Sequence, residues 1–552
     1  MSDAQRKPLV DAAESKTLRM RGNSLHGNRE ALETPSLIDS RGRSEKAYGP
    51  TSDMHVSRES DGPIVPEKRT NNAGPKAAAE SVEGRGSTKG NATRTLLVPD
   101  SEPGKRGMGL LGVREAAKRD KKLRFTTLLH HVSTELLRAS FFELKRQAAP
   151  GVDGMTWHEY GRNLEERLDA LHGRIHRGAY RAKPSKRAWI PKADGRQRPL
   201  GIAALEDKIV QQAIKTVLEQ IYEEDFLGFS YGFRPGRSCH NALDALWVGI
   251  AHRKVNWVLD ADIRGFFYNI DHELLLKFVE HRIADRRILR LIRKWLRAGV
   301  SEDGQWSQTT VGTPQGSVIS PLLANVFLHY VFDLWANQWR KCHARGSVIM
   351  IRYADDFVVG FQDRGDAERF LRELRKRLEQ FGLQLHPDKT RLIEFGRYAV
   401  ERREERGEGR PETFDFLGFT HCCGKTRKGA FTIKRKSIAK RMRAKLQEIK
   451  RQLTTRMHDA IVAVGGWLRS VVRGWYNYHA IPGNINCLDE FRTQVQRLWR
   501  RVLRRRSQKG RVWTWLRMQR LTQRWLPSAQ ILHPYPDERF DRHLTQGKSR
   551  MR

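Results

Sequence analysis

Two short acidic runs carry the side chains best suited to chemistry. The first, LDADIRGFF, contains Asp260 and Asp262, which share one face of a strand because side chains alternate with a period of two. The second, RYADDFVV, places Asp355 and Asp356 between two apolar runs that are typical of strands. The pattern predicts a hairpin whose turn carries two acids, and carboxylates from separate strands that converge.

Such a cluster is suited to binding two magnesium ions about 4 Å apart, since Mg²⁺ prefers carboxylate oxygens and needs neither His nor Cys. One ion would activate an attacking hydroxyl group, and the other would stabilise a leaving pyrophosphate during an in-line displacement. An Asp-Asp pair is also common in turns that perform no chemistry. From the acidic runs alone, a solvent-exposed turn without a metal ion therefore remains the alternative to a metal site.

Further runs follow in a fixed order along the chain. Residues 313–325 (TPQGSVISPLLAN) lie between the two acidic runs, and the three together resemble the catalytic motifs of reverse transcriptases. The run IPKADGRQRPLGI at 190–202 resembles the fingers motif of these enzymes, and FSYGFRPG at 229–236 resembles the block after it. Residues 385–390 and 416–419 resemble the late palm motifs and the primer grip. The order of these motifs and the residues within them resemble those of bacterial group II intron-encoded proteins.

This resemblance covers about residues 113–540 and has consequences for the whole chain. It implies an RNA-directed DNA polymerase that also binds its own intron RNA to assist splicing, and that copies this RNA into DNA. The implied partners are group II intron RNA, a DNA target with its primer strand, and deoxynucleoside triphosphates. No cysteine follows Cys487, so the paired cysteines of the family's endonuclease domain lack a counterpart. The chain therefore resembles the endonuclease-lacking type, which is expected to use a pre-existing 3′ end as primer.

The resemblance also assigns roles to the acidic side chains. It selects Asp262 as the first catalytic aspartate, because this residue precedes the Ile-Arg-Gly-Phe run, and it leaves Asp260 as a supporting carboxylate. Asp355 and Asp356 match the catalytic pair after Tyr-Ala. The implied ligands of two Mg²⁺ ions are these three catalytic aspartates and the main-chain carbonyl of Ile263.

Five further side chains are implied in binding the incoming nucleotide. By resemblance, Lys192 and Arg198 lie over the triphosphate, where charge develops as pyrophosphate leaves. Gln315 packs against the sugar or base, and Lys389 is placed to protonate the leaving pyrophosphate. Phe267 falls where an aromatic ring excludes a ribonucleotide by steric hindrance, which implies selection of deoxynucleotides.

The charge of the chain favours a polyanionic partner such as nucleic acid. Its 552 residues include 102 Lys and Arg against 63 Asp and Glu, which gives a net charge of +39. After about residue 434, three apolar stripes at helical spacing predict three amphipathic helices with basic outer faces. The residues expected to bind RNA in this region are Lys434, Arg435, Lys440 and Arg443.

Short strand-like runs that alternate with amphipathic helices between about residues 180 and 419 predict an α+β or α/β fold. The resemblance implies the α+β form, with the fingers and palm of a right-hand polymerase, an antiparallel palm sheet and an α-helical thumb. The expected parts are a disordered extension over 1–110, fingers and palm over 111–425, a thumb or maturase domain over 426–540 and a basic tail over 541–552. No apolar run reaches the roughly 18 to 20 residues that span a bilayer, so a cytoplasmic protein without a membrane partner is expected. The oligomeric state stays open.

Two other functions compete with this interpretation. One is an RNA-binding splicing factor with a vestigial polymerase site, and the full set of acidic and nucleotide-binding residues argues against it. The other is a retron-like or CRISPR-associated reverse transcriptase without a role in splicing. The extension around PGVDG at 150–154, and the helical domain with GWYNYH at 474–479, argue against that second alternative.

Overall fold

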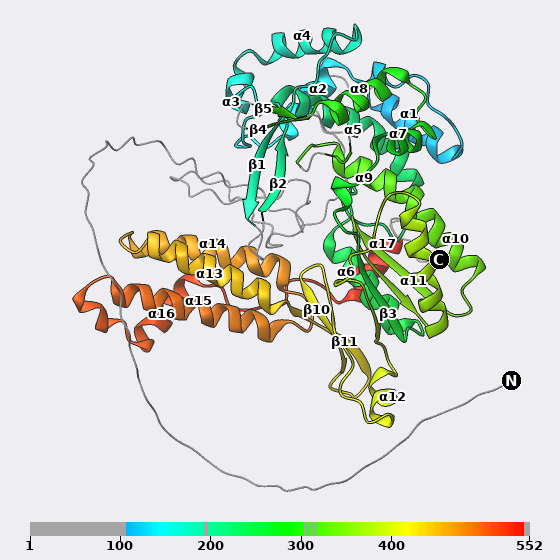
Figure 1. Ribbon diagram of the computed structural model, residues 1–552. Coiled ribbons are helices and arrows are strands. Elements are labelled where there is room, and N and C mark those ends of the chain that lie inside the picture. Colours follow the sequence, from blue (N-terminus) through cyan, green and yellow to red (C-terminus); the bar gives the residue numbers. More distant parts are fainter. Residues whose placement is uncertain (1–105, 192–196, 303–304, 308–310, 314–315, 546–552) are drawn as a thin grey trace, which may run out of the picture. The chain divides into compact units, whose positions relative to one another are not determined.

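The computed structural model describes five stretches of the chain (Figure 1), which are 106–191, 197–302, 305–307, 311–313 and 316–545. The extension expected to be disordered over 1–110 lies almost wholly outside these stretches, as does most of the expected tail. Lys192 and Gln315 also lie outside the described residues. Within these stretches, no helix is both long and apolar enough to cross a membrane.

The first part of the described chain is mostly helical. Its α-helices are α1 (Arg106–Arg119), α2 (Thr134–Glu143), α3 (Trp157–Tyr160), α4 (Leu164–His176), α5 (Leu205–Asp225), α7 (His272–Glu280) and α8 (Arg286–Arg297), with 3-10 turns at Leu129–His131 and Gly161–Asn163. Helix α8 illustrates why they form: Ile288, Ile292 and Trp295 recur every three to four residues and are buried, while Arg286 and Arg290 face outward. The side chain of Asp285 caps its first turn.

A small sheet accompanies these helices in the expected fingers region. Its strand order is β2-β1-β4-β5, and the strands are β1 (Ser185–Pro191), β2 (Gln197–Ile202), β4 (Val300–Glu302) and β5 (Gln305–Ser307). Strands β1 and β2 form an antiparallel hairpin, whereas β4 runs parallel to β1. The fingers motif recognised in the sequence is this hairpin.

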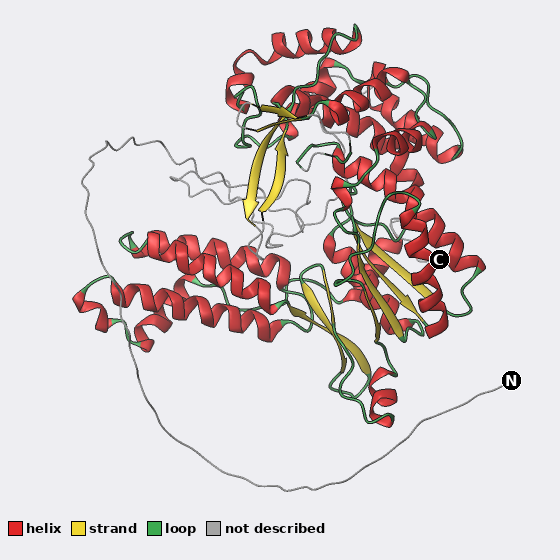
Figure 2. Ribbon diagram, viewed as in Figure 1, coloured by secondary structure: helices red, strands yellow, loops and turns green. Residues whose placement is uncertain are grey.

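A four-stranded palm sheet carries the two acidic runs. Its order is β6-β7-β3-β8, every neighbouring pair is antiparallel, and the strands are β3 (Trp257–Asp262), β6 (Val348–Tyr353), β7 (Asp356–Phe361) and β8 (Arg391–Glu394). Helix α11 (Arg364–Glu379) packs on one face and α6 (Cys239–His252) on the other (Figure 2). Because both faces are covered, consecutive positions are apolar, which explains the runs VIMI and FVV.

One long helical segment beside the palm sheet is interrupted in its middle. Helices α9 (Ser320–Leu328) and α10 (Leu334–Cys342) are joined by a π-helical turn over His329–Asp333. Such turns inside α-helices are frequent at functional sites. Here the turn ends at Asp333, whose side chain is completely buried.

A three-stranded sheet connects the palm to the thumb, and the helical thumb region begins later than the sequence predicted. The strands are β9 (Phe414–Phe416), β10 (Phe419–Lys425) and β11 (Phe431–Ser437), in the order β11-β10-β9, after helix α12 (Ala399–Glu405). The helical region therefore begins at Ala439 and not at 426 as expected. The reason is the alternation in β11, where Ile433, Arg435 and Ser437 are buried and the residues between them are exposed.

The three helices expected in the thumb are present, and two more follow them. Helices α13 (Ala439–Thr455), α14 (Ile461–His479) and α15 (Ile485–Arg505) match the three apolar stripes, and α16 (Trp515–Trp525) lies beside α14 and α15 (Figure 1). A 3-10 turn at Gln508–Val512 precedes α16, and α17 (Pro536–Thr545) packs back against α6 of the palm. The buried stripes form a separate thumb core around Leu468, Trp475 and Trp499.

This core predicts a local stability effect. Leu468 is 0% exposed, so Leu468→Ala removes buried methyl groups and leaves a cavity, which costs about 2–5 kcal/mol. We expect the amides of α14 and α15 to exchange faster in a hydrogen–deuterium exchange experiment, by the factor that this loss of unfolding free energy corresponds to. Val462→Ala in the same helix is the control, because Val462 is 61% exposed and its truncation changes stability by roughly 0.5 kcal/mol or less. Equal protection in both variants would contradict the packing.

Candidate active site

The two acidic runs meet at one end of the palm sheet. In the register of β3 and β7, Asp262 lies opposite Asp356, and Asp260 lies opposite Val358. Side-chain alternation therefore puts Asp260, Asp262 and Asp356 on the same face of the sheet. Asp355 lies in the two-residue turn between β6 and β7. The predicted acidic hairpin and the predicted convergence of carboxylates from two strands are both confirmed at the level of the backbone.

The turn that carries Asp355 has an unusual backbone. Ala354 has a φ of 56°, a left-handed conformation that costs an alanine about 1–3 kcal/mol and persists only where the surroundings enforce it. The main chain of Gly232 lies against this turn so closely that a Cβ atom added there would overlap the main-chain nitrogen of Ala354. The segment around Gly232 therefore braces the turn from one side.

A buried arginine braces the turn from beneath. The side chain of Arg352 is 0% exposed, and its Nε and Nη2 donate to the two oxygens of Asp333 at 2.7 and 2.5 Å. Its Nη1 donates to the main-chain carbonyl of Ala354 at 3.0 Å and to Asn325 Oδ1 at 3.0 Å. Nη2 also donates to Ser230 Oγ at 2.7 Å. Arg352 thus fixes the residue immediately before Asp355.

Sequence reasoning treated Arg352 only as part of the run around the acids and missed its role. The sequence did contain an indication of this role. Arg352 continues the apolar run VIMI within one strand, so its side chain is expected to be buried, and a buried charge is expected to have a partner. Its partner could not be read from the sequence. Asp333 lies nineteen positions earlier, in the π-helical turn, and belongs to no recognised motif.

Asp262 has a cationic partner on the neighbouring chain segment. Lys389 Nζ lies 2.8 Å from Asp262 Oδ2, and the two side chains are 58% and 20% exposed. Main-chain hydrogen bonds hold the two segments together, from His386 N to Asp262 O and from Arg264 N to Gln384 O, both at 2.8 Å. Neither of these two bonds uses the main-chain carbonyl of Ile263, the residue expected to complete a metal shell.

Asp260 lies on the same sheet face as Asp262 and is buried to the same extent, with 19% of its side chain exposed against 20%. Burial raises its pKa to about 7, and the nearby guanidinium of Arg391, 3.7 Å away, only partly opposes this shift. The neighbouring carboxylates of Asp415 and Asp262 raise the pKa further. The ion pair with Arg391 is consistent with the supporting position that the resemblance implies for Asp260.

The donor set at this edge fits a divalent cation in its chemistry. Asp262, Asp355, Asp356 and the Ile263 carbonyl offer only hard oxygen atoms, which Mg²⁺ prefers. Among the described side chains, no group of three His, Cys, Asp or Glu is arranged closely enough to hold a metal ion. One oxygen of Asp262 faces the ammonium group of Lys389. A cation that binds Asp262 Oδ2 would therefore have to displace this ammonium group.

The residues expected to bind the nucleotide lie in different surroundings. Phe267 is half-buried in the short 3-10 helix Phe266–Tyr268, directly after β3, and its carbonyl accepts a hydrogen bond from Thr313 N at 2.8 Å. Arg198 is largely buried in β2, opposite Ile190. The structure thus brings Phe267 next to the segment that leads to Gln315.

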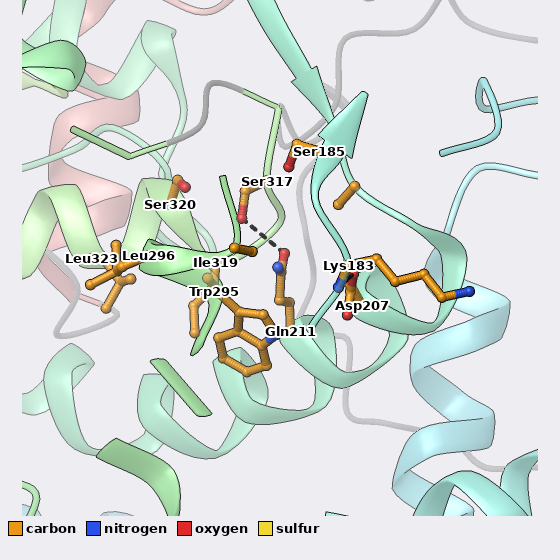
Figure 3. Close-up of a pocket in the computed structure, with 12 residues that line it drawn as sticks. Lys183, Ser185, Asp207, Gln211, Trp295, Leu296, Ser317, Ile319, Ser320 and Leu323 are labelled. Atoms are coloured by element: carbon orange, nitrogen blue, oxygen red, sulfur yellow. Dashed lines mark hydrogen bonds between the residues drawn. The ribbon is translucent and has the colours of Figure 1, made fainter. Parts of the chain in front are cut away.

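A small pocket lies behind the segment that follows Gln315 (Figure 3). Buried Gln211 of α5 points into it, and Gln211 Oε1 accepts hydrogen bonds from Ser317 Oγ at 2.9 Å and from Val318 N at 3.0 Å. Asp207, one helical turn earlier, lines the same pocket, and burial raises its pKa to about 6. Gln211 belongs to no recognised motif, yet its amide fixes the chain close to a residue expected to touch the nucleotide.

The turn expected to act as a primer grip is tied to the thumb. Leu417 and Gly418, between β9 and β10, have φ values of 45° and 86°. Tyr478 of α14 donates its hydroxyl hydrogen to the carbonyl of Leu417 at 2.8 Å. Palm turn and thumb helix are therefore held by a direct hydrogen bond.

One of the four residues expected to bind RNA is wrongly assigned. Arg435 is 1% exposed and its Nη1 donates to Asp244 Oδ1 at 3.0 Å, so no phosphate can reach it. Burial lowers the pKa of its guanidinium, while the carboxylate of Asp244 opposes this. The strand alternation in β11 turns Arg435 inward. Lys434, Lys440 and Arg443 are exposed, as expected.

The end of β3 and the β6–β7 hairpin present three aspartates at one end of an antiparallel sheet, as expected for the palm of a right-hand polymerase. Residues 190–421 match the family model described as reverse transcriptase (RNA-dependent DNA polymerase). Protein YkfC of Escherichia coli (strain K12) is 33% identical over 336 residues, which cover 53% of this chain and 88% of that protein. The chain belongs to the family of group II intron reverse transcriptases and maturases.

Other relatives are similar over shorter stretches. The group II intron-encoded protein LtrA of Lactococcus lactis subsp. cremoris is 41% identical over 166 residues, or 30% of this chain and 27% of that protein. Nuclear intron maturase 1 of Arabidopsis thaliana, a mitochondrial protein, is 26% identical over 92 residues, or 17% of this chain and 13% of that protein. The chain thus spans most of YkfC but only about a quarter of LtrA.

The close approach of Gly232 to the acidic turn gives a testable prediction. In Gly232→Ala the new methyl group must push the main chain of Ala354 away, which displaces Asp355. Because a misplacement of about 1 Å can cost on the order of 100-fold in rate, we expect primer extension on an RNA template to slow by that order. The measurement is single-turnover incorporation of one deoxynucleotide.

Gly409→Ala is the matched control for this substitution. A Cβ atom at Gly409 meets nothing within 4 Å, so its extension rate is expected to equal that of the unaltered protein. An unchanged rate in Gly232→Ala would mean that the position of the turn does not matter for synthesis.

Proposed function

We propose that Asp262, Asp355 and Asp356 hold two Mg²⁺ ions, and that the protein uses this site to copy the group II intron RNA that its thumb binds. The observation that carries the proposal is the register of β3 and β7, with Asp262 opposite Asp356 and Asp355 in the adjoining turn. Relatives named as an intron-encoded protein and an intron maturase support intron RNA as the partner.

Reverse transcriptases generally use divalent metal ions. Bound here, such ions would lower the pKa of the primer 3′-hydroxyl and neutralise charge on the leaving pyrophosphate. The three aspartates and the Ile263 carbonyl would hold them, while Lys192 and Arg198 attract the triphosphate. Phe267 lies just beyond β3, where its ring would exclude a ribose 2′-hydroxyl. The proposed substrates are deoxynucleoside triphosphates, and the proposed primer is a pre-existing DNA 3′ end.

The thumb has the charge that RNA binding requires. Between Glu490 and Asp537 the chain contains twelve Lys and Arg and no Asp or Glu, and most of these cations are exposed on α15, α16 and the turn between them. Arg500 lies 4.1 Å from the ring centroid of Trp515, which is half exposed. An uncompensated cationic surface with an accessible aromatic ring favours a phosphate backbone with unpaired bases. This is consistent with a maturase role.

The first prediction from this function concerns the chemistry. Asp355→Asn keeps the shape of the side chain but weakens its grip on both metal ions, so primer extension on an RNA template should fall below detection. The affinity for RNA, measured by filter binding, should stay within about twofold because the basic surfaces are unchanged.

Asp169→Asn, in the exposed part of α4, is the matched control and should extend primers at the original rate. Comparable extension by Asp355→Asn would remove the metal-site assignment. A parallel loss of RNA affinity would point instead to misfolding.

The second prediction separates RNA binding from synthesis. Replacement of Lys434, Lys440 and Arg443 by Gln should weaken intron RNA binding and splicing. It should also reduce the slope of log affinity against log salt by about 2 to 3, because each lost phosphate contact releases roughly one counterion fewer. The same number of charges removed from the exposed face of α11, at Arg372, Arg375 and Lys376, serves as the control.

The reciprocal variant is Asp262→Asn, assayed for splicing and for synthesis of complementary DNA in parallel. It should stop DNA synthesis while splicing continues, because the exposed basic surfaces are untouched. Normal splicing by the triple thumb variant, or failed splicing by a folded Asp262→Asn protein, would contradict this division of labour.

A further inference from the structure

Two cations face two acids across neighbouring segments of the palm. Asp260 of β3 is paired in register with Arg391 of β8. Beyond this pair the register shifts, because Asp262 O accepts a hydrogen bond from His386 N and not from Lys389, which lies in the turn before β8. The ammonium group of Lys389 nevertheless reaches Asp262, at 2.8 Å. The two ion pairs therefore lie near each other along β3, one formed by a strand partner and the other by a turn.

Main-chain hydrogen bonds hold the turn that carries Lys389 next to the end of β3. The segment before β8 is joined to the end of β3 by an antiparallel bridge between Ile263 and Leu385. Hydrogen bonds from His386 N to Asp262 O and from Thr390 N to His386 O flank Lys389 on both sides. The main chain on both sides of Lys389 is thus fixed close to Asp262, within reach of the lysine side chain.

There is a physical reason for a cation at this place. Asp262 and Asp356 lie directly opposite each other in the β3–β7 register, and like charges in opposed positions destabilise a sheet. A metal-free palm therefore needs another positive charge at its acidic edge. Lys389 is the cation that the structure places on Asp262.

We propose that Lys389 is the built-in counter-cation of the metal site, which holds the Asp262 carboxylate until a divalent cation displaces it. The inference rests on the proposed metal-binding role of Asp262. It adds that Lys389 competes with the metal ion for the same oxygen, and that it is therefore a positioning residue for Asp262 in the metal-free protein. Removal of the ammonium group then makes divalent cations bind more tightly.

The test measures binding of Mn²⁺ alone to the full chain, by electron paramagnetic resonance of the free ion, with no nucleotide or RNA present. Lys389→Met should bind Mn²⁺ about two- to fivefold more tightly than the unaltered protein, the range expected for loss of a half-exposed ion pair. Lys389→Arg keeps the positive charge and should bind Mn²⁺ with nearly the original affinity. Lys376→Met removes the same charge from the exposed face of α11 and is the control for net charge.

Thermal unfolding supplies a second measurement that a purely structural lysine would not reproduce. In the presence of a chelator, Lys389→Met should unfold at a lower temperature than the unaltered protein, because the opposed carboxylates lose their counter-cation. At saturating Mn²⁺ the difference should disappear, since the metal ion then supplies the charge in both proteins.

The outcomes separate this inference from the proposed function. Mn²⁺ affinity in Lys389→Met that is equal to or lower than the original overturns the competition, provided that Asp262→Asn binds Mn²⁺ more weakly. If Asp262→Asn binds Mn²⁺ as well as the unaltered protein, both the metal-site assignment and the counter-cation role are wrong. An equal gain in Lys376→Met would show a general effect of net charge and would also overturn the proposal.

Discussion

The buried ion pair between Arg352 and Asp333 is the constraint on which the palm depends. Both side chains are 0% exposed, and removing two charges from water costs several kcal/mol each unless every donor and acceptor is satisfied. The structure meets this condition by drawing Ser230, Asn325 and the carbonyl of Ala354 around the guanidinium. Segments that are more than a hundred residues apart are thereby fixed to the strand that leads into the acidic turn.

The arrangement of the candidate site follows from this constraint and from sheet register. The π-helical turn supplies Asp333, and the guanidinium holds Ala354 in its left-handed conformation. Asp355 completes the turn, and Asp356 then begins β7 opposite Asp262. The same principle recurs where the palm meets the C-terminal region. There, buried Asp244 of α6 pairs with Arg435 of β11 and with Arg539 of α17. A strongly basic chain thus uses a few buried acids to order its arginines and leaves the rest for nucleic acid.

Local patterns predicted the parts of this protein that depend on local periodicity. Strand β3, the acidic hairpin and helices α13 to α15 follow from apolar alternation or helical stripes, and the confirmed reverse transcriptase class follows from ordered motifs. The sequence did not predict the surroundings of side chains whose interaction partners lie far away along the chain. Arg435 sits in a basic run that looks uniformly exposed, but its alternation in β11 turns it toward Asp244, which is 191 residues away. The Lys389 contact with Asp262 spans 127 residues and depends on strand order, which no local pattern contains.

Arg352 both stabilises the palm and positions the acidic turn, and one pair of variants separates these two effects. Arg352→Met should leave Asp333 buried with only the His329 imidazole 4.0 Å away. It should lower the opening free energy of the β6–β7 amides by about 3–5 kcal/mol in hydrogen exchange. The double variant Arg352→Met with Asp333→Leu should regain most of this stability, since an apolar pair can replace a buried ion pair. Its primer extension should nevertheless stay low, because the Ala354 carbonyl has lost its donor. Wild-type exchange and wild-type extension in Arg352→Met would contradict the account.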